Sequence, residues 1–191
     1  MRLDPMDIAE LKAELERLHR ASFGWAMSCC RRDQSEAEEV LQTVYVKILE
    51  GKARYRGESS LKTWLFAVIR KTAISEHRRG LLRRLRFIAE PEHQTQRIPA
   101  HEEPGMVFER SEAQTRFQHA LETLPARQRE ALHLVFDEDL SLREAADVMG
   151  VSIGSARQHY DRGKKRLRES MEQEVAYGIR WRGKQNPGIV S

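Results

Sequence analysis

Residues 141–167, SLREAADVMGVSIGSARQHYDRGKKRL, hold the pattern that decides the fold of the second half of the chain. Ser141 stands three residues before Glu144, which is the spacing of a capping box at the start of a helix. Gly150 lies where a tight turn between two helices needs a residue without a Cβ atom. Ser152 is placed to cap the helix that follows. The pattern predicts a helix-turn-helix, a unit whose second helix enters the major groove of DNA in many proteins.

The second predicted helix carries hydrogen-bond donors along its outward face, while Ile153, Ala156 and Tyr160 face inward. Arg can form two hydrogen bonds with guanine and Gln two with adenine, and a Ser near a helix N-terminus can reach a phosphate. A plain helical hairpin has the same apolar pattern but does not explain this row of donors. The candidate DNA-contacting residues are Ser155, Arg157, Gln158, His159, Arg162 and Lys164.

Positive charge is concentrated in two blocks, although the net charge of the 191-residue chain is only +4. Residues 52–86 hold eleven Lys and Arg against two Glu, and residues 155–168 hold six against one Asp. Such blocks are expected where a protein neutralises phosphates. For either block alone, a solvated helix face is the alternative interpretation.

Aromatic residues accompany the first basic block, and aromatic rings flanked by cations can bind unstacked bases. Tyr55 falls in a predicted loop, where its exposure is left open. Ser59 or Ser60 is placed to cap a long helix from residue 61, and Trp64 lies on the apolar stripe of that helix, which favours a core position. The candidate nucleic-acid-facing residues are Tyr55, Arg56, Ser59, Arg70, Lys71, Arg78 and Arg79.

Residues 35–49 form a different kind of predicted helix, capped by Asp33 or Ser35, with an apolar face and an acidic face. An acidic face does not suit DNA. From the residues alone it is either solvated or a docking surface for a partner protein.

Composition excludes several classes of protein. No apolar run approaches the roughly 20 residues that span a bilayer, and the N-terminus opens into charged sequence rather than a secretory signal, so a cytoplasmic protein with no membrane insertion is expected. Cys29 and Cys30 are expected to be structural helix residues, and the histidines show no metal-like pairing with them. No nucleophile–base motif or phosphate-binding glycine loop occurs. We therefore expect a binding protein, not an enzyme, with no metal and no cofactor.

The expected fold is all-α, with two small helical domains joined by a flexible linker. Strand-like alternation never persists, whereas helical spacing does. Residues 1–88 form the first predicted domain and residues 108–175 the second. Residues 89–107 form the linker, since 89–105 hold three prolines and no helical period. Residues 176–191 are expected to be a loose tail.

Three segments together resemble the extracytoplasmic-function (ECF) sigma factors, the small two-domain class of bacterial transcription initiation factors. They are SEAEEVLQTVYVKILE (35–50), YRGESSLKTWLFAVIRKTAISEHRR (55–79) and the stretch 124–167, which contains the predicted helix-turn-helix. The resemblance covers about residues 10–86 and 108–172. It implies that 124–167 reads the −35 promoter element, and that 55–79 melts the −10 element and captures a flipped base in the loop before its helix.

The resemblance also implies partners. The 35–50 helix resembles the family's segment that docks on the β′ clamp helices of core RNA polymerase, with further contacts to the β subunit. An anti-sigma factor, anchored in the membrane, is expected to cover the docking faces. The docking residues implied are Glu36, Glu38, Glu39, Gln42, Thr43 and Val46.

This chain departs from the family pattern where bases are read. Lys71 and Ser75 stand where the family usually has Asn and Asp, and His159 stands where Arg is common. The promoter sequence therefore does not transfer with the resemblance. The alternative function is an autonomous helix-turn-helix regulator, although the sequence shows no heptad seam for dimerisation and no ligand-binding domain.

Overall fold

The computed structural model describes residues 7–88, 117, 119–121 and 123–184, without the side chains of 8, 84–88 and 173–184. Every regular element within these ranges is helical, which confirms the predicted all-α class. The predicted linker at 89–107, the start of the second predicted domain and residues 185–191 lie outside the described residues.

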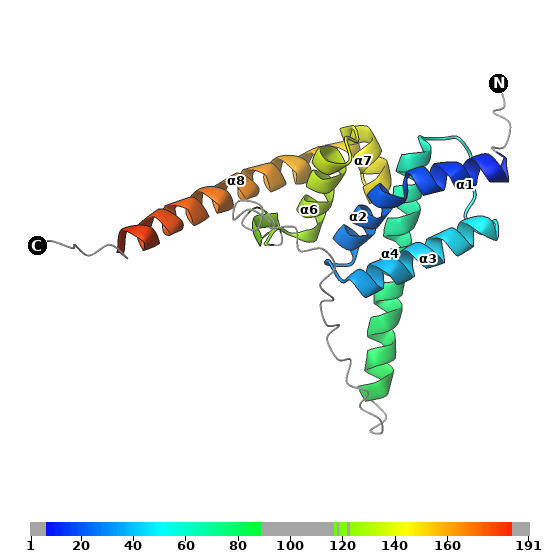
Figure 1. Cartoon of the computed structure of the whole chain (residues 1–191), viewed down its shortest axis with the longest axis horizontal. Coiled ribbons are helices and arrows are strands. Elements are labelled where there is room, and N and C mark those ends of the chain that lie inside the picture. The colour runs from blue at the N-terminus through cyan, green and yellow to red at the C-terminus, as the bar shows by residue number, and fades with distance from the viewer. Residues whose placement is uncertain (1–6, 89–116, 118, 122, 185–191) are drawn as a thin grey trace, which may run out of the picture.

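The first half of the molecule is built from α1 (Ile8–Arg17), α2 (His19–Cys29), α3 (Gln34–Leu49) and α4 (Leu61–Ile88), with α2, α3 and α4 packed against one another (Figure 1). Trp25 of α2 is fully buried at their centre and stacks on Phe66 of α4, with ring centroids 5.9 Å apart. Its indole N–H donates to the Phe66 carbonyl over 3.0 Å, so the buried polar atom is satisfied.

Local sequence explains where these helices begin and end. The Asp33 carboxylate accepts the Glu36 amide at 2.9 Å, and the Ser60 hydroxyl accepts the Thr63 amide at 3.1 Å. Of each predicted pair of capping residues, these two are therefore the ones that cap α3 and α4. Gly51 follows α3 with a φ of +69°, a left-handed conformation that glycine adopts without Cβ strain.

The second half contains α6 (Ala126–Leu132), the π-helical turn η1 (His133–Asp137), α7 (Leu142–Met149) and α8 (Ile153–Lys184). In Figure 1, α8 extends well beyond the other helices. The prediction of a loose tail from residue 176 is wrong as far as Lys184, because the helix continues to that residue. No proline occurs between Ile153 at the start of α8 and Pro187, and an established helix propagates without needing an amphipathic pattern.

The two halves lie against each other. Helix α4 of the first half contacts α7 of the second, and buried apolar residues of both halves belong to one contiguous core. The sequence predicts two bodies on a tether but contains no pattern that predicts this contact.

Candidate nucleic-acid and polymerase interfaces

The helix-turn-helix is fixed by the residues that the sequence singles out. The Ser141 hydroxyl accepts the Glu144 amide at 3.3 Å, and the Glu144 carboxylate accepts the Ser141 amide at 2.9 Å, which completes the capping box. Hydrogen bonds from Ser141 lower the pKa of Glu144 and keep it ionised at the positive end of the α7 dipole. Gly150 has a φ of +63°, so the turn needs the glycine that the sequence places there.

Helix α8 begins with an outward row of donors. The Ser152 hydroxyl accepts the Ser155 amide at 3.1 Å and shares a hydrogen bond of 2.9 Å with the Ser155 hydroxyl. Ala156 is fully buried and sets the inward face. The other predicted −35 contacts divide into an exposed group and one half-buried residue: Arg157, Gln158, Arg162 and Lys164 are exposed, and His159 is half-buried. This exposed face has the arrangement that a helix needs in order to enter the major groove of DNA.

The loop before α4 is ordered by Tyr55. The Tyr55 hydroxyl donates to the Ser59 carbonyl at 2.6 Å, and its ring lies 5.5 Å from that of Trp64. Both aromatic side chains are half-buried, so neither is simply core or simply exposed. Arg56 is exposed in this loop, and Ser59 is half-buried.

The basic residues of α4 have different surroundings. Lys71, Arg78 and Arg79 are exposed, although Arg79 pairs with Glu76 at 2.8 Å. Arg70 is only 9% exposed, and its Nε atom lies 3.2 Å from the Glu130 carboxylate of the second half. Contrary to the expectation that it faces nucleic acid, Arg70 is therefore covered in this arrangement. Its partner lies 60 residues away in sequence, which is why local charge counting misses it.

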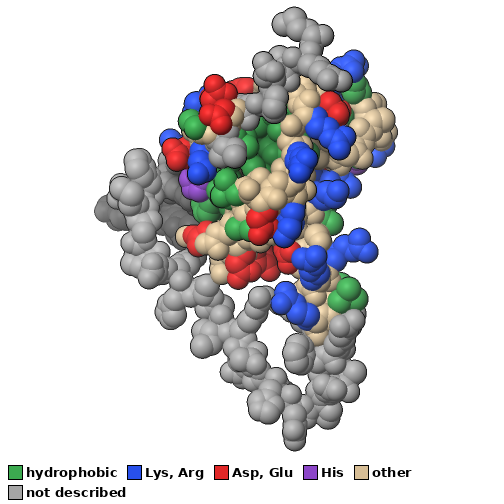
Figure 2. Space-filling view, turned by 90° about the vertical axis from the view of Figure 1, so that its right-hand side faces the viewer, with side chains coloured by type: hydrophobic (Ala, Val, Ile, Leu, Met, Phe, Trp, Pro, Cys, Tyr) green, Lys and Arg blue, Asp and Glu red, His purple; other side chains and the backbone are tan. Residues whose placement is uncertain are grey.

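The acidic side of α3 is open. Glu38, Glu39 and Gln42 are exposed, Glu36 and Thr43 are half-buried, and Val46 is about half exposed. Figure 2 shows Asp and Glu side chains gathered on one face of the molecule, with a strip of Lys and Arg beside them. An exposed face that combines acids with an apolar residue suits a protein partner better than it suits nucleic acid.

Comparison with known proteins decides between the families of helical DNA-binding proteins. The sigma-70 region 2 family matches residues 15–83, and the sigma-70 region 4 family matches residues 120–169. The RNA polymerase sigma factor YlaC of Bacillus subtilis is 27% identical over 135 residues, which is 71% of this chain and 77% of that protein. The ECF RNA polymerase sigma factor SigX of Bacillus subtilis is 29% identical over 142 residues, 74% of this chain and 73% of that protein.

The chain belongs to the ECF sigma factors.

Solved structures agree with this membership. The sigma factor RpoE of Bartonella quintana, crystallised with the anti-sigma factor NepR, matches with a TM-score of 0.67 and 26% identity over 86% of this chain and 98% of that one. The protein CnrH, solved with the cytosolic domain of CnrY, matches with a TM-score of 0.58 and 16% identity over 87% of this chain and 90% of that one, which shows the fold alone. The helix-turn-helix of this ECF sigma factor is thus its region 4, and the α1–α4 bundle is its region 2.

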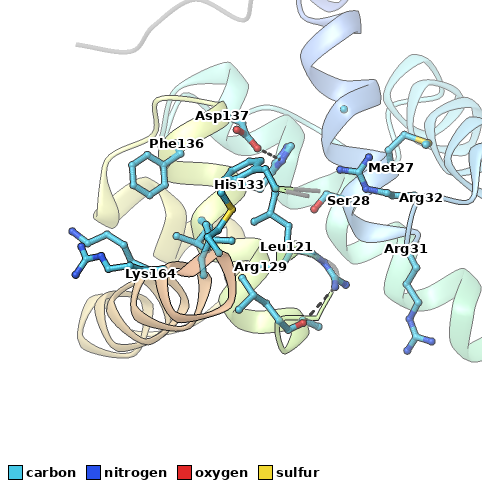
Figure 3. A pocket seen from close by; sticks show the side chains of 18 of the residues that line it. Met27, Ser28, Arg31, Arg32, Leu121, Arg129, His133, Phe136, Asp137 and Lys164 are labelled. Carbon is cyan, nitrogen blue, oxygen red and sulfur yellow. Dashed lines mark hydrogen bonds and ion pairs between the residues drawn. The ribbon is translucent and has the colours of Figure 1, made fainter. Parts of the chain in front are cut away.

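A groove of about 1080 Å³ lies between region 2 and region 4 of this sigma factor. Phe23 and Met27 of α2 form one apolar wall, and Leu132 and Phe136 lie on the other. Figure 3 shows Met27, Leu121, His133 and Phe136 around it, with Arg31, Arg32 and Lys164 nearby. Lys164, predicted as a −35 contact, is thus also a wall residue of this groove. No sequence signal marked the groove, because its walls come from segments about 100 residues apart.

The neighbouring thiols of this sigma factor are largely covered by protein. Cys29 is half-buried and Cys30 buried, and both are free. Burial raises the pKa of Cys29 well above its usual value, and burial together with Glu36 and Asp33 raises the pKa of Cys30 to about 12. Both groups are therefore neutral thiols near pH 7 and poor nucleophiles.

Among the described residues, no helix is long and apolar enough to cross a membrane, and no three His, Cys, Asp or Glu side chains gather as a metal site.

Proposed function

We propose that this ECF sigma factor binds core RNA polymerase in the cytoplasm, directs it to promoters through −35 and −10 contacts, and promotes DNA melting. The observation that carries the proposal is the capped start of α8, which presents Arg157 and Gln158 to solvent on a region 4 helix-turn-helix. Region 2 supports it with an acidic, exposed α3 face and a basic α4.

At the −35 element, α8 enters the major groove. Arg157 and Gln158 contact base edges, and Ser155 at the helix N-terminus contacts a phosphate, aided by the positive end of the helix dipole. Arg162 lies one turn further along the exposed side of α8, where it neutralises backbone charge.

At the −10 element, region 2 opens the duplex. Unstacking costs a few kcal/mol per base step, and stacking or hydrogen bonds to the captured bases offset that cost. The loop that Tyr55 holds in place is the surface for captured bases, and Arg56 lies exposed beside it. Lys71, Arg78 and Arg79 supply phosphate contacts along α4.

Polymerase makes the two weak DNA contacts effective together. We propose that α3 docks on the β′ clamp helices through Glu36, Glu38, Glu39, Gln42, Thr43 and Val46, and that region 4 docks on the β subunit. Holding both regions on one enzyme raises the effective concentration of each region at its own DNA element.

Charge reversal on α3 tests the docking face. The change Glu38→Lys/Glu39→Lys is expected to abolish capture of core polymerase and run-off transcription while leaving helical content unchanged. The matched control is Glu10→Lys/Glu16→Lys, which reverses two exposed acids of α1 and is expected to keep both activities. Transcription that survives the α3 reversal contradicts the docking face. A parent chain that binds −35 duplex but never binds core polymerase contradicts the sigma function and favours an autonomous regulator.

The groove between the regions fits an anti-sigma factor. Its apolar walls suit the apolar face of a helix, and Arg31, Lys164 and Arg168 line it with positive charge. We therefore propose that a membrane-anchored anti-sigma factor inserts an amphipathic helix with acidic side chains. Met27→Glu is expected to reduce capture of that partner from host membranes at least tenfold. The captured protein must also displace core polymerase from the parent chain, and a protein that does not displace it contradicts the proposal.

A further inference from the structure

Two ion pairs join region 2 to region 4. The Lys62 ammonium lies 2.8 Å from the Glu138 carboxylate and donates to the Glu138 carbonyl at 2.7 Å. The Arg70 guanidinium lies 3.2 Å from the Glu130 carboxylate. In each pair the cation comes from α4 and the acid from region 4. We call these four residues the latch.

The latch is largely covered from water. The side chains of Glu138 and Arg70 are only 8% and 11% exposed. Removing one partner of a covered pair leaves the other charge buried and uncompensated, which destabilises the contact strongly. Glu130 also lies 3.3 Å from Arg127 of its own helix, which holds the carboxylate in place for Arg70.

Apolar and polar contacts surround the latch. His133 of η1 stacks on Trp25 of α2, with ring centroids 5.3 Å apart, and Thr63 of α4 donates to the Glu144 carboxylate at 3.4 Å. The two regions therefore share an extended interface that contains two ion pairs, a ring stack and a hydrogen bond.

This closed arrangement cannot serve a promoter. Elements centred near −35 and −10 are about 25 base pairs apart, which is roughly 85 Å of B-form duplex. In the structure α4 and α7 are in direct contact, so regions 4 and 2 cannot reach both elements at once. The latch also covers Arg70 while leaving Arg157 and Gln158 of α8 exposed. The closed state therefore covers one candidate −10 contact, Arg70, and leaves the candidate −35 contacts Arg157 and Gln158 exposed.

We propose that the free sigma factor rests in this closed state, held by an intramolecular latch in which Glu130 and Glu138 occupy cations of α4 that are freed when the regions separate. The proposal rests on the proposed function, because it treats α4 as the −10-reading helix. Arg70 then has two alternative anionic partners, the Glu130 carboxylate in the closed state and a DNA phosphate in the open state. Opening exposes the covered charges to water, and polymerase stabilises the open state by holding the two regions apart.

Small-angle X-ray scattering of the free chain tests the latch without polymerase. Glu130→Lys places a cation against Arg70 and is expected to increase the radius of gyration and the maximum dimension. The double change Arg70→Glu/Glu130→Lys restores opposite charges and is expected to return both values toward those of the parent. The matched control is Glu169→Lys, an acid of α8 that lies 3.9 Å from Lys165 of the same helix, and it is expected to change neither value.

A second variant guards against local unfolding. Glu138→Gln removes the other acid of the latch without adding a like charge, and it too is expected to expand the chain. Circular dichroism and binding to −35 duplex must stay at parent levels in each variant, because α8 does not carry the latch. Unchanged scattering in both Glu130→Lys and Glu138→Gln, with the fold intact, would falsify the latch. Expansion of the double charge swap equal to that of Glu130→Lys also overturns it.

Affinity for core polymerase supplies the functional measurement. If one parent molecule in ten is open, the open variant Glu138→Gln binds core polymerase about tenfold more tightly. A chain that expands as expected but never binds core polymerase contradicts the proposed function and leaves the latch standing. A chain that binds core polymerase but whose latch variants bind no more tightly than the parent contradicts the proposed regulatory role.

Discussion

Helices α4 and α8 carry the same kind of sequence signal but present it differently. Both are long and basic, and both are candidates for reading DNA. On α8, Arg157 and Gln158 are exposed at the capped start of the helix. On α4, Arg70 is covered by region 4 and paired with Glu130. A count of basic residues does not separate these cases, because the acid that decides the difference is distant in sequence.

The difference has a physical origin in the neighbours of each helix. Helix α8 packs on α6 and α7 of its own half, which leaves one side open. Helix α4 packs on α2 and α3 and also contacts α7 of the other half, so part of its basic surface is enclosed. Availability for DNA is thus a property of the contact between the regions and not of either helix.

The largest expected effect comes from removing Trp25, whose ring stacks on Phe66 of α4 and on His133 of η1. Trp25→Ala deletes a fully buried ring that contacts Phe66 and His133, and it is expected to lower the free energy of unfolding by about 3–5 kcal/mol. Trp64→Ala, at a half-buried ring, is the control with a smaller loss. Urea unfolding measures both. A loss for Trp25→Ala that is no larger than the loss for Trp64→Ala contradicts the central place of Trp25 in region 2.

Arg157→Ala tests whether the exposed donors at the start of α8 read DNA. If Arg157 contacts a base edge, its loss weakens binding to −35 duplex by about 1–3 kcal/mol, or roughly 5- to 150-fold. Arg143→Ala removes an exposed cation of α7 that is not among the candidate base contacts and is expected to have a smaller effect. Fluorescence anisotropy with duplex DNA at fixed salt measures both. Unchanged binding by Arg157→Ala rejects its role as a reading residue.

Substitutions at two glycines, Gly163 of α8 and Gly80 of α4, test how closely each helix packs against its neighbours. A Cβ at Gly163 of α8 would lie 3.1 Å from the Gln128 carbonyl and 3.2 Å from Leu132, whereas a Cβ at Gly80 of α4 meets nothing within 4 Å. Overpacking costs about 1–3 kcal/mol and better helix propensity returns about 1 kcal/mol. Gly163→Ala is therefore expected to destabilise by about 1 kcal/mol and Gly80→Ala to stabilise by up to about 1 kcal/mol. Thermal unfolding distinguishes them, and a stabilising Gly163→Ala contradicts the close α6–α8 contact.

The smallest expected effect lies at the start of α7. Because the pKa of Glu144 is lowered in the folded chain, its ionised carboxylate stabilises the fold above pH 4.5, and that contribution is lost as the pH falls below 4.5 through the folded pKa. Glu144→Gln is expected to cost about 0.5–1 kcal/mol at pH 7, and this cost is expected to shrink as the pH falls below 4.5. Glu169→Gln, on the exposed side of α8, is the control. Urea unfolding at pH 7 and at a series of lower pH values measures the difference, and a cost that does not shrink as the pH falls assigns the effect to packing instead.

Much of the fold followed from local pattern. The capping box at Ser141, the left-handed Gly150 and the cap at Ser152 act within a few residues, so the sequence specifies them and the structure confirms them. The end of α8 was predicted too early, because a missing amphipathic pattern does not stop a helix. Most candidate contacts on α3 and α8 are exposed, as helical period predicts, whereas Glu36, Thr43, Ser155 and His159 are half-buried.

Local pattern was enough to predict the all-α class, the two helical halves and the outward faces of the helices, because caps and periodicity act over one or two turns. The contact between the halves depends on how the helices pack in three dimensions. The same packing pairs Lys62 with Glu138 and Arg70 with Glu130, and it forms the apolar groove between α2 and region 4. These features join side chains 60 or more residues apart. The energies of these contacts depend on burial and on the distances between side chains, and a local sequence pattern predicts neither quantity.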